Sequence, residues 1–352
     1  MQTKFVGILT GGGDCPGLNP AIKAITQMAE EFGYQVLGIQ DGWKGLSAPA
    51  PQSISLDSKQ VCHIDRQGGT ILGTSRTNPY KLDHGIEQLK TNWQKLKLEA
   101  LIAIGGEDTL GVAARLFDEE KLAVMGVPKT IDFDLPGTDY TLGFESALHV
   151  IMESIDRLRS TAESHARIFV VEVMGRHAGH LALQGGIAAG AQVILIPEYD
   201  FEIDRVVSLL QERKKQGNRY SIVVVAEGAK AVGQQENLAG REKDAFGHIR
   251  LGGIGEYLAD SIAKQGNLEC RSVNLSHLQR GGAPVAYDRR MGFAFGVASV
   301  QAVLAKQYGQ LVSFSDGKVV LKNLSLVRGP IRCVKLETEY DEANYRAKRS
   351  II

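Results

Sequence analysis

Segments typical of β-strands and of α-helices alternate along most of this chain, and this order limits the folds that it can adopt. Apolar runs of strand length are found at residues 5–10, 34–39, 98–104, 122–127, 168–174, 193–197 and 221–226. Apolar positions at helical spacing are found at residues 19–32, 144–164, 177–189, 203–215, 255–264 and 287–306. A strand, a helix and a second strand in succession are typical of parallel pairing, with helices covering the sheet. The sequence therefore predicts an α/β protein with mainly parallel sheets.

Length and charge exclude several classes of protein. At 352 residues the chain can form two domains with cores of their own. It has 40 Lys and Arg and 40 Asp and Glu residues, so its formal net charge of zero gives no overall attraction to nucleic acid or anionic lipid. No apolar run approaches the roughly 20 residues of a membrane span, and the N-terminal residues do not form a signal peptide. We therefore expect a cytoplasmic protein without nucleic-acid or membrane partners.

The four cysteines, Cys15, Cys62, Cys270 and Cys333, are widely spaced and form no CxxC pair. Reduced thiols are therefore expected, and a zinc site is not.

Residues 229–250 are polar and lack periodicity, which predicts a mobile surface loop. The charged residues 337–350 predict a solvated or surface-docked tail.

Polar residues directly follow two of the expected strands, at 105–109 and at 129–134. Because ligands of α/β sheets bind beyond the carboxyl ends of the strands, we expect these loops to share a crevice. Their charged residues are Glu107, Asp108, Lys129, Asp132 and Asp134. In an extended segment Asp132 and Asp134 would point the same way. Glycines beside phosphate, acids that hold Mg²⁺ and an acid that deprotonates a hydroxyl are the parts of phosphoryl transfer.

Other candidate binding residues also lie at strand ends. The glycine-rich turn at residues 11–17 precedes a helix, a place that suits phosphate. Its spacing matches neither the dinucleotide motif nor the P-loop, so a turn without a ligand remains the alternative. Arg176 suits a transition-state charge. Arg271, His277 and Arg280 suit a phosphate monoester, with a basic surface cluster as the alternative.

Glu227 follows the expected strand at 221–226, where a carboxylate either accepts hydrogen bonds from a sugar or is only solvated. His177 and His180 are three residues apart at the start of an expected helix. No third metal ligand accompanies them, so a metal pair is not expected there.

Taken together, these motifs resemble the phosphofructokinase family. The matching elements occur in the family's order over residues 5 to about 290: GILTGGGDCPGLN, GGTILGTSRTNP, IGGEDT, PKTIDFD, ESHARIFVVEVMGR, VVVAEG and LSHLQRGG. The resemblance implies two Rossmann-like lobes with mainly parallel sheets and an active site in the cleft between them, in a homodimer or homotetramer. Residues 1–142 with about 280–306 would form the phosphoryl-donor lobe. Residues 143–279 with about 307–352 would form the sugar-phosphate lobe.

The resemblance also implies a role for each matching residue. Asp132 resembles the base that deprotonates the sugar 1-hydroxyl, and Asp134 is the second acid of that motif. Thr130 and Arg176 resemble residues that contact the transferred phosphoryl group. The residues that match contacts to fructose 6-phosphate are Thr130, Arg167 (contributed across a subunit interface), Met174, Gly175, Arg176, Glu227, Arg271, His277 and Arg280. Gly13 and Arg76 match the donor-phosphate site, and Glu107 stands where the family usually has an aspartate linked to Mg²⁺.

Two residues indicate the phosphoryl donor. ATP-using relatives have glycine in place of Asp108 and commonly in place of Lys129. A carboxylate in the path of a nucleotide α-phosphate adds bulk and like-charge repulsion, whereas an ammonium can bind a phosphate of pyrophosphate. The pair therefore predicts transfer from pyrophosphate to fructose 6-phosphate, giving fructose 1,6-bisphosphate, a reversible step of glycolysis. An ATP-dependent 6-phosphofructokinase is the alternative, and Asp108 is the deciding residue.

Besides Glu107, this chain departs from the family pattern at two further positions near the expected site. Phe133 replaces the usual asparagine of TIDND, and Ser276 replaces the usual glycine before the histidine of LGHxQRGG. A sugar-phosphate sensor without turnover is an alternative from another class, but the intact acids and arginines argue against it. Sedoheptulose 7-phosphate as a second acceptor, the choice between dimer and tetramer, and allosteric regulation stay open.

Overall fold

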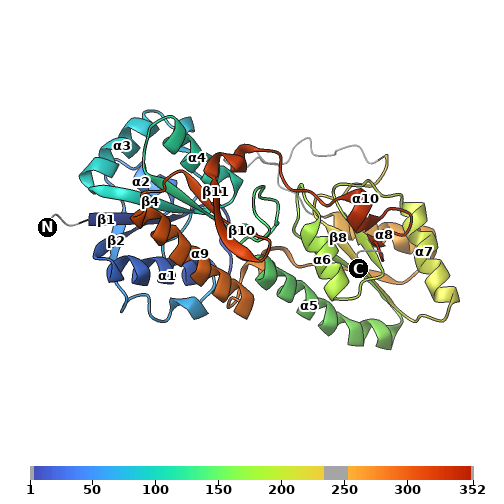
Figure 1. The fold of residues 1–352 in the computed structure, drawn as a ribbon. Helices are drawn as coiled ribbons and strands as arrows, with labels where there is room; N and C mark the ends of the chain where they lie inside the picture. The colour runs from blue at the N-terminus through green and yellow to red at the C-terminus, as the bar shows by residue number, and fades with distance from the viewer. Residues whose placement is uncertain (1–3, 234–252, 350–352) are drawn as a thin grey trace. The chain divides into compact units, whose positions relative to one another are not determined.

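The computed structural model describes residues 4–233 and 253–349 (Figure 1). By its contacts the chain divides into two compact units, each of which is described by itself. Unit 1 comprises Met1–Ile131, Leu135–Ser146 and Arg280–Pro330, and unit 2 comprises Asp132–Asp134, Ala147–Gln279 and Ile331–Ile352. Most of the polar stretch predicted to be a mobile loop, residues 234–250, lies outside the described residues.

Unit 1 is built on a mainly parallel sheet. Its elements are β1 (Lys4–Thr10), α1 (Leu18–Glu31), β2 (Tyr34–Ile39), α2 (Trp43–Leu46), β3 (Ser53–Leu56), η1 (Ile64–Arg66), η2 (Pro79–Lys81), α3 (Gly85–Lys95), β4 (Leu98–Gly105), α4 (Glu107–Asp118), β5 (Val124–Pro128), α9 (Ala286–Leu304), β10 (Gln310–Ser315), β11 (Lys318–Asn323) and η4 (Leu324–Arg328). Within the described residues the strand order is β11-β10-β5-β4-β1-β2-β3, with only the edge strands β3 and β11 antiparallel to their neighbours.

Helices cover both faces of this sheet (Figure 1). Helices α1 and α9 pack together on one face, and α3 and α4 lie on the other. Apolar side chains of β1 and β4, such as Leu9 and Leu101, join Trp43, Trp93 and Leu110 in one buried cluster. The burial of these strands fits their nearly continuous apolar sequences. The sheet thereby fixes the carboxyl ends of β1, β4 and β5 side by side, with Thr10 paired to Ile104 and Gly105 to Pro128.

Unit 2 contains a smaller parallel sheet with the order β7-β8-β6-β9 within the described residues. Its elements are β6 (Ile168–Val173), α6 (His180–Ala188), β7 (Val193–Leu195), α7 (Ile203–Lys215), β8 (Ser221–Ala226), α8 (Ile254–Gly266), β9 (Cys270–Asn274), α10 (Leu336–Glu339), β12 (Tyr340–Asp341) and β13 (Arg346–Ala347). Helix α5 (Phe144–His165) and the short η3 (Ser276–Arg280) each belong partly to unit 1 and partly to unit 2.

The C-terminal tail docks on the edge of the second sheet. The Ile194 amide donates to the Tyr345 carbonyl (2.7 Å), and the Tyr340 hydroxyl donates to the Ile194 carbonyl (2.6 Å). Both tyrosines are buried. Of the two forms predicted for this tail, solvated and surface-docked, the structure shows the docked one.

The predicted fold class is confirmed: both sheets are mainly parallel and helices alternate with strands. The division of the sequence into lobes differs from the prediction mainly after residue 306, apart from short exchanges at residues 132–134 and 143–146. Residues from about 307 were expected in the sugar-phosphate lobe, but β10 and β11 extend the sheet of unit 1, because β10 pairs with β5.

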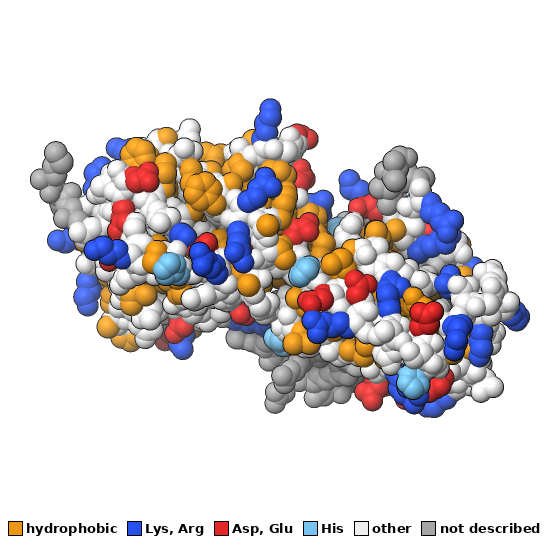
Figure 2. Space-filling view, turned by 90° about the horizontal axis from the view of Figure 1, so that it is seen from below, with side chains coloured by type: hydrophobic (Ala, Val, Ile, Leu, Met, Phe, Trp, Pro, Cys, Tyr) orange, Lys and Arg blue, Asp and Glu red, His pale blue; other side chains and the backbone are white. Residues whose placement is uncertain are grey.

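The surface carries mixed charge. On the face shown in Figure 2, Lys and Arg side chains are interspersed with Asp and Glu side chains, in keeping with the formal net charge of zero. No helix of the described residues is both long enough and apolar enough to cross a membrane.

Candidate active site

The glycine-rich turn after β1 is held against two neighbouring segments of unit 1. The Gly11 amide donates to the Ile104 carbonyl (3.0 Å) at the end of β4. The Gly12 amide donates to the Ser75 carbonyl (3.1 Å), and the Thr74 hydroxyl donates to the Gly12 carbonyl (2.7 Å). Because Arg76 directly follows Ser75, these bonds place the predicted donor-binding arginine next to the turn.

Lys129 lies beneath this turn. Only 3% of the residue is exposed, and its ammonium donates to the carbonyls of Gly11 (3.0 Å) and Gly13. A buried ammonium needs such acceptors, since an unpaired charge is costly to bury. The structure thus places a fixed positive charge directly behind the backbone that was predicted to hold the donor phosphate. The Lys129 ammonium is thus held in place by the protein, unlike the ammonium of a flexible lysine side chain that moves to contact its ligand.

Glu107 and Asp108 form the first turn of α4 and are exposed. The sequence predicted a loop at these residues, which is wrong: the helix begins immediately after Gly106. Acids are stabilised in a first helical turn because the macrodipole is positive there. The Lys129 amide donates to the Gly105 carbonyl (2.9 Å), so β5 continues beside this helix start and Thr130 follows next to it.

Arg280 packs on the glycine turn within unit 1. A β-carbon at Gly13 would lie 1.7 Å from Nη1 of Arg280, so a larger residue there would displace this guanidinium from the turn. The family resemblance predicted that Arg280 contacts the sugar phosphate together with Arg271 and His277. In the structure Arg280 shares unit 1 with the donor-side residues, whereas Arg271 and His277 belong to unit 2.

In unit 2, four predicted sugar-binding residues lie together where β6 and β8 end. Met174, Gly175 and Arg176 follow β6, and Glu227 follows β8. The Glu227 amide donates to the Val173 carbonyl (2.8 Å), and the Gly228 amide donates to the Gly175 carbonyl (3.1 Å). The left-handed backbone of Gly175, at φ 126°, explains why a glycine stands in this turn.

His277 is joined to this group through a buried glutamine. Oε1 of Gln279 accepts from the Met174 amide (3.3 Å), and its Nε2 donates to the Ser276 carbonyl (3.1 Å). His277 itself is exposed, with Nδ1 3.0 Å from the Ser276 hydroxyl. No role was predicted for Gln279: it lies inside LSHLQRGG, but only the structure shows that this polar residue is fully buried.

Asp132 and Asp134 group with unit 2. The expectation that they point the same way from an extended segment is not supported by the backbone. Phe133 between them has φ 60°, a left-handed conformation, and residues 131 and 132 form a bend. The Arg332 amide donates to the Asp134 carbonyl (2.8 Å), so the segment is fixed by a contact with the C-terminal part of the chain.

Arg167 and Arg271 lie at the opposite end of the second sheet from Met174. Both contact Glu269, at 2.6 Å for Arg167 and 3.6 Å for Arg271. Arg167 precedes β6 and Arg271 is the second residue of β9, with Phe169 and Arg271 in register. Seven residues of extended chain separate Arg167 from Met174, or roughly 23 Å. Within one chain the structure therefore does not bring these arginines to the other sugar-binding residues.

His177 and His180, at which no metal pair was predicted, differ in their surroundings. His177 is exposed, whereas His180 is buried and its Nε2 donates to the Arg332 carbonyl (3.1 Å). Across residues 4–233 and 253–349, no group of three or more His, Cys, Asp or Glu side chains could hold a metal ion.

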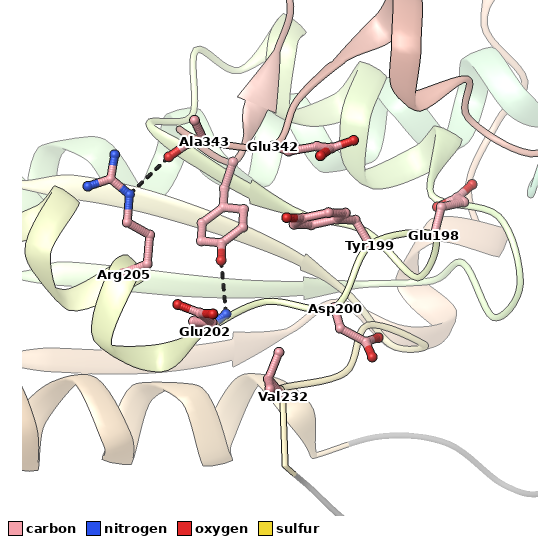
Figure 3. A pocket seen from close by; sticks show the side chains of 9 residues that line it. Glu198, Tyr199, Asp200, Glu202, Arg205, Val232, Glu342 and Ala343 are labelled. Atoms are coloured by element: carbon pink, nitrogen blue, oxygen red, sulfur yellow. Dashed lines mark hydrogen bonds between the residues drawn. The ribbon is translucent and has the colours of Figure 1, made fainter.

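A pocket of about 650 Å³ in unit 2 contains none of the predicted site residues (Figure 3). Its wall includes the carboxylates of Glu198, Asp200, Glu202 and Glu342. Arg205, on the same wall, donates to the Ala343 carbonyl (2.9 Å). Four carboxylates would repel a phosphate ligand, so this pocket is not a candidate for the site of phosphoryl transfer.

Comparisons with known proteins identify the family. A model of the family described as phosphofructokinase matches residues 5–303. A protein of Amycolatopsis methanolica named pyrophosphate--fructose 6-phosphate 1-phosphotransferase is 49% identical over 339 residues, covering 96% of this chain and 98% of that protein. An ATP-dependent 6-phosphofructokinase of Mycobacterium leprae is 44% identical, covering 96% of this chain and 98% of that protein.

Solved structures agree in fold. The pyrophosphate-dependent phosphofructokinase of Marinobacter aquaeolei has a TM-score of 0.83 at 21% identity, covering 98% of this chain and 89% of that chain. The phosphofructokinase of Saccharomyces cerevisiae has a TM-score of 0.78 at 30% identity over 93% of this chain, which spans 45% of the yeast chain. The chain belongs to the phosphofructokinase family.

Proposed function

We propose that this protein transfers a phosphoryl group from pyrophosphate to the 1-hydroxyl of fructose 6-phosphate, giving fructose 1,6-bisphosphate and phosphate. The observation that carries the proposal is the near full-length similarity, at 48–50% identity, to proteins named for this reaction. Relatives named as ATP-dependent match at 42–44% identity, and ATP therefore remains the second candidate donor.

The donor-side residues of unit 1 suit a small, highly charged donor. Gly13 and Arg76 would contact its phosphates, with the charges of Lys129 and Arg280 directly at the glycine turn. Asp108 is exposed in the first turn of α4, where it would repel a longer polyphosphate chain. This arrangement supports pyrophosphate over ATP.

The remaining groups supply acid–base chemistry and charge stabilisation. Asp132 would take the proton from the sugar 1-hydroxyl, with Asp134 as the second acid. Thr130 and Arg176 would stabilise charge on the transferred group, since positioning and electrostatics supply most of the acceleration in phosphoryl transfer. Met174, Gly175, Glu227 and His277 would bind the sugar phosphate.

Magnesium fits the donor-side residues through one acid. At phosphoryl-transfer sites Mg²⁺ is commonly held by one or two carboxylates together with substrate phosphates, so a cluster of three protein ligands is not required. Glu107 is exposed in the first turn of α4, the helix whose Thr109 lies against Gly11, and is the acid that would contact the ion. When bound, Mg²⁺ neutralises negative charge on the phosphoryl oxygens.

We also propose that the sugar site is completed by a second protomer, in a homodimer or homotetramer. Arg167 and Arg271 share Glu269 toward the end of the second sheet away from Met174, roughly 23 Å and 16 Å along the strands, beyond the reach of an arginine side chain. Their charges would reach a sugar phosphate only from a neighbouring copy of the chain.

Initial rates with fructose 6-phosphate and Mg²⁺, measured with pyrophosphate and separately with ATP, test the proposal. We expect a much larger kcat/KM with pyrophosphate. A larger value with ATP would contradict pyrophosphate as the donor while leaving the acceptor and the catalytic acids in place. Binding of fructose 6-phosphate without turnover of either donor would instead favour the sensor alternative.

A further inference from the structure

Residues 331–334 contact the segment Asp132–Asp134 from the C-terminal part of unit 2. The Arg332 amide donates to the Asp134 carbonyl (2.8 Å). The Arg332 guanidinium lies over the Phe133 ring, with 4.3 Å between its central carbon and the ring centroid. One residue of the C-terminal part thus holds both the backbone and the side chain of this segment.

His180 completes the contact. Its ring meets the Phe133 ring edge-on, with the centroids 5.5 Å apart and the planes at 86°. Because a carbonyl only accepts, the 3.1 Å bond to the Arg332 carbonyl fixes the imidazole proton on Nε2. Phe133 therefore packs against the side chains of Arg332 and His180, and the His180 ring is bonded to the backbone carbonyl of Arg332.

The four-residue segment 331–334 is tied down on its other side by Glu198. Its Oε1 accepts from the Val334 amide (2.8 Å) and from the Gly179 amide (2.9 Å), just ahead of α6. The segment is therefore a fixed support rather than a free chain end.

Phe133 needs such support because of its backbone. At φ 60° it occupies a conformation that is uncommon for a bulky side chain, and such residues persist where surrounding contacts impose them. If the ring lost its contacts, the two peptide groups on either side of it would be free to rotate. These peptide groups carry Asp132 and Asp134.

We propose that Arg332 and His180 are positioning residues that hold Phe133 and thereby orient Asp132 and Asp134 for phosphoryl transfer. This inference rests on the proposed function, in which Asp132 is the base. The three residues would act as one unit: removing any one contact should release the same segment.

Steady-state kinetics of Phe133→Leu, Arg332→Gln and the double variant test this unit. We expect each single variant to lower kcat on the order of ten- to a hundredfold with the KM values for both substrates changed less than about twofold, because small displacements of a catalytic group act on turnover. The double variant should be no worse than the poorer single variant. Losses that multiply in the double variant, or a higher KM with unchanged kcat, would overturn the proposal.

Two further variants separate positioning from folding. Arg205→Gln is the matched control, since Arg205 also bonds a carbonyl of the C-terminal tail but contacts none of the three residues; it should retain wild-type kcat. Phe133→Asn supplies a residue that tolerates the left-handed backbone without the ring contacts, so it should fold normally and lose less turnover than Phe133→Leu. A kcat of Phe133→Asn no higher than that of Phe133→Leu would overturn the proposal.

Amide hydrogen exchange of the full chain tests the contact without any activity. Phe133→Leu should raise exchange at the Arg332 amide, with exchange elsewhere in β6 and β8 unchanged. If the wild-type protein turns over neither donor, the proposed function fails, and this exchange measurement still decides the inference. Unchanged exchange at Arg332 would overturn it.

Discussion

Phe133 and Ser276 are two of the positions near the site at which this chain departs from the family pattern, and both have left-handed backbones, at φ 60° and φ 39°. The residues that they replace, asparagine and glycine, are the types that adopt this conformation most easily. Each replacement costs on the order of 1 kcal/mol in backbone strain. Each also makes a contact that its predecessor could not make in the same way: a ring between Arg332 and His180, and a hydroxyl at His277.

Because Ser276 adds both backbone strain and a contact with His277, its replacement by glycine has two predicted effects. In Ser276→Gly the strain is relieved but the 3.0 Å contact with Nδ1 of His277 is lost. We expect an unfolding free energy no lower than that of the wild type, and a KM for fructose 6-phosphate about two- to tenfold higher, the value of one neutral hydrogen bond. Urea unfolding and initial rates check the two parts. Ser276→Ala should raise KM equally without the gain in stability, and an unchanged KM in both variants would show that the hydroxyl does not orient His277.

Asp108 gives a second prediction at this scale. In Asp108→Gly the exposed carboxylate at the start of α4 is removed, so like-charge repulsion and bulk no longer oppose a nucleotide. We expect ATP-dependent turnover to rise about tenfold or more, equivalent to roughly 1.4 kcal/mol, and pyrophosphate use to weaken. Asp83→Gly, at another exposed acid of unit 1, is the control. If ATP turnover does not rise, Asp108 is not the sole block to nucleotide.

Buried carboxylates from other elements hold the N-termini of two helices. Asp288 of α9 accepts from the amides of Gly143 (2.6 Å) and Ser146 (2.8 Å) at the start of α5. Glu172 of β6, 3% exposed, accepts from the Gly255 amide (2.8 Å) at the start of α8 and from the Asn274 side chain (2.9 Å). Negative charge is favourable at a helix N-terminus, where several amides have no partner within the helix.

Glu172→Gln tests this arrangement. The amide of glutamine would present a donor to groups that are all donors, so one or more buried amides would lose their acceptor. We expect a loss of about 2–3 kcal/mol in the free energy of unfolding, measured by urea denaturation. Glu163→Gln, on the exposed surface of α5, should change it little. Equal effects of the two substitutions would mean that Glu172 does not anchor α8.

At the level of elements, the sequence predicted best where periodicity was strong. The bounds of β2, β8 and α7 agree with those predicted, because their apolar patterns begin and end sharply. The start of α4 was missed, since Glu107 and Asp108 follow two glycines and have no apolar pattern of their own. The bend at Phe133 was missed because its supports, His180 and Arg332, are about 50 and 200 residues away in the sequence. The motifs did group the residues at the ends of β6 and β8, but no local pattern indicates that Arg280 lies on Gly13.

At the scale of the whole molecule, stability should depend on pH through His180. Burial lowers the pKa of this imidazole below its usual 6.5; the Arg332 charge also lowers it, whereas the hydrogen bond to the Arg332 carbonyl and the charge of Glu339 act in the opposite direction. The unfolded chain therefore binds the proton more readily than the folded chain. We expect the free energy of unfolding to fall as the pH is lowered below about 6.5. Urea unfolding between pH 5 and 8 should show a smaller decline for His180→Gln, and identical slopes would contradict this origin.

A second prediction at this scale concerns the arrangement of protomers. If Arg271 acts on a partner's site, Asp132→Asn and Arg271→Ala chains are each inactive alone but complement each other when mixed. Random reassociation of a dimer gives hybrids in which one of the two sites has neither substitution, or about a quarter of wild-type activity overall. Refolding equal amounts together and measuring turnover checks this, with each variant refolded alone as the control. No recovery would place both residues in the same chain's site.

The docked tail has a consequence beyond the site. Ile194 is the middle residue of the edge strand β7. Its outward-facing amide donates to the Tyr345 carbonyl, and its carbonyl accepts from the Tyr340 hydroxyl. An exposed sheet edge is a template on which another chain can add a strand, and proteins commonly cover such edges to stay dispersed. Substitutions that detach the tail are therefore expected to reveal themselves first as aggregation in concentrated solution or during expression.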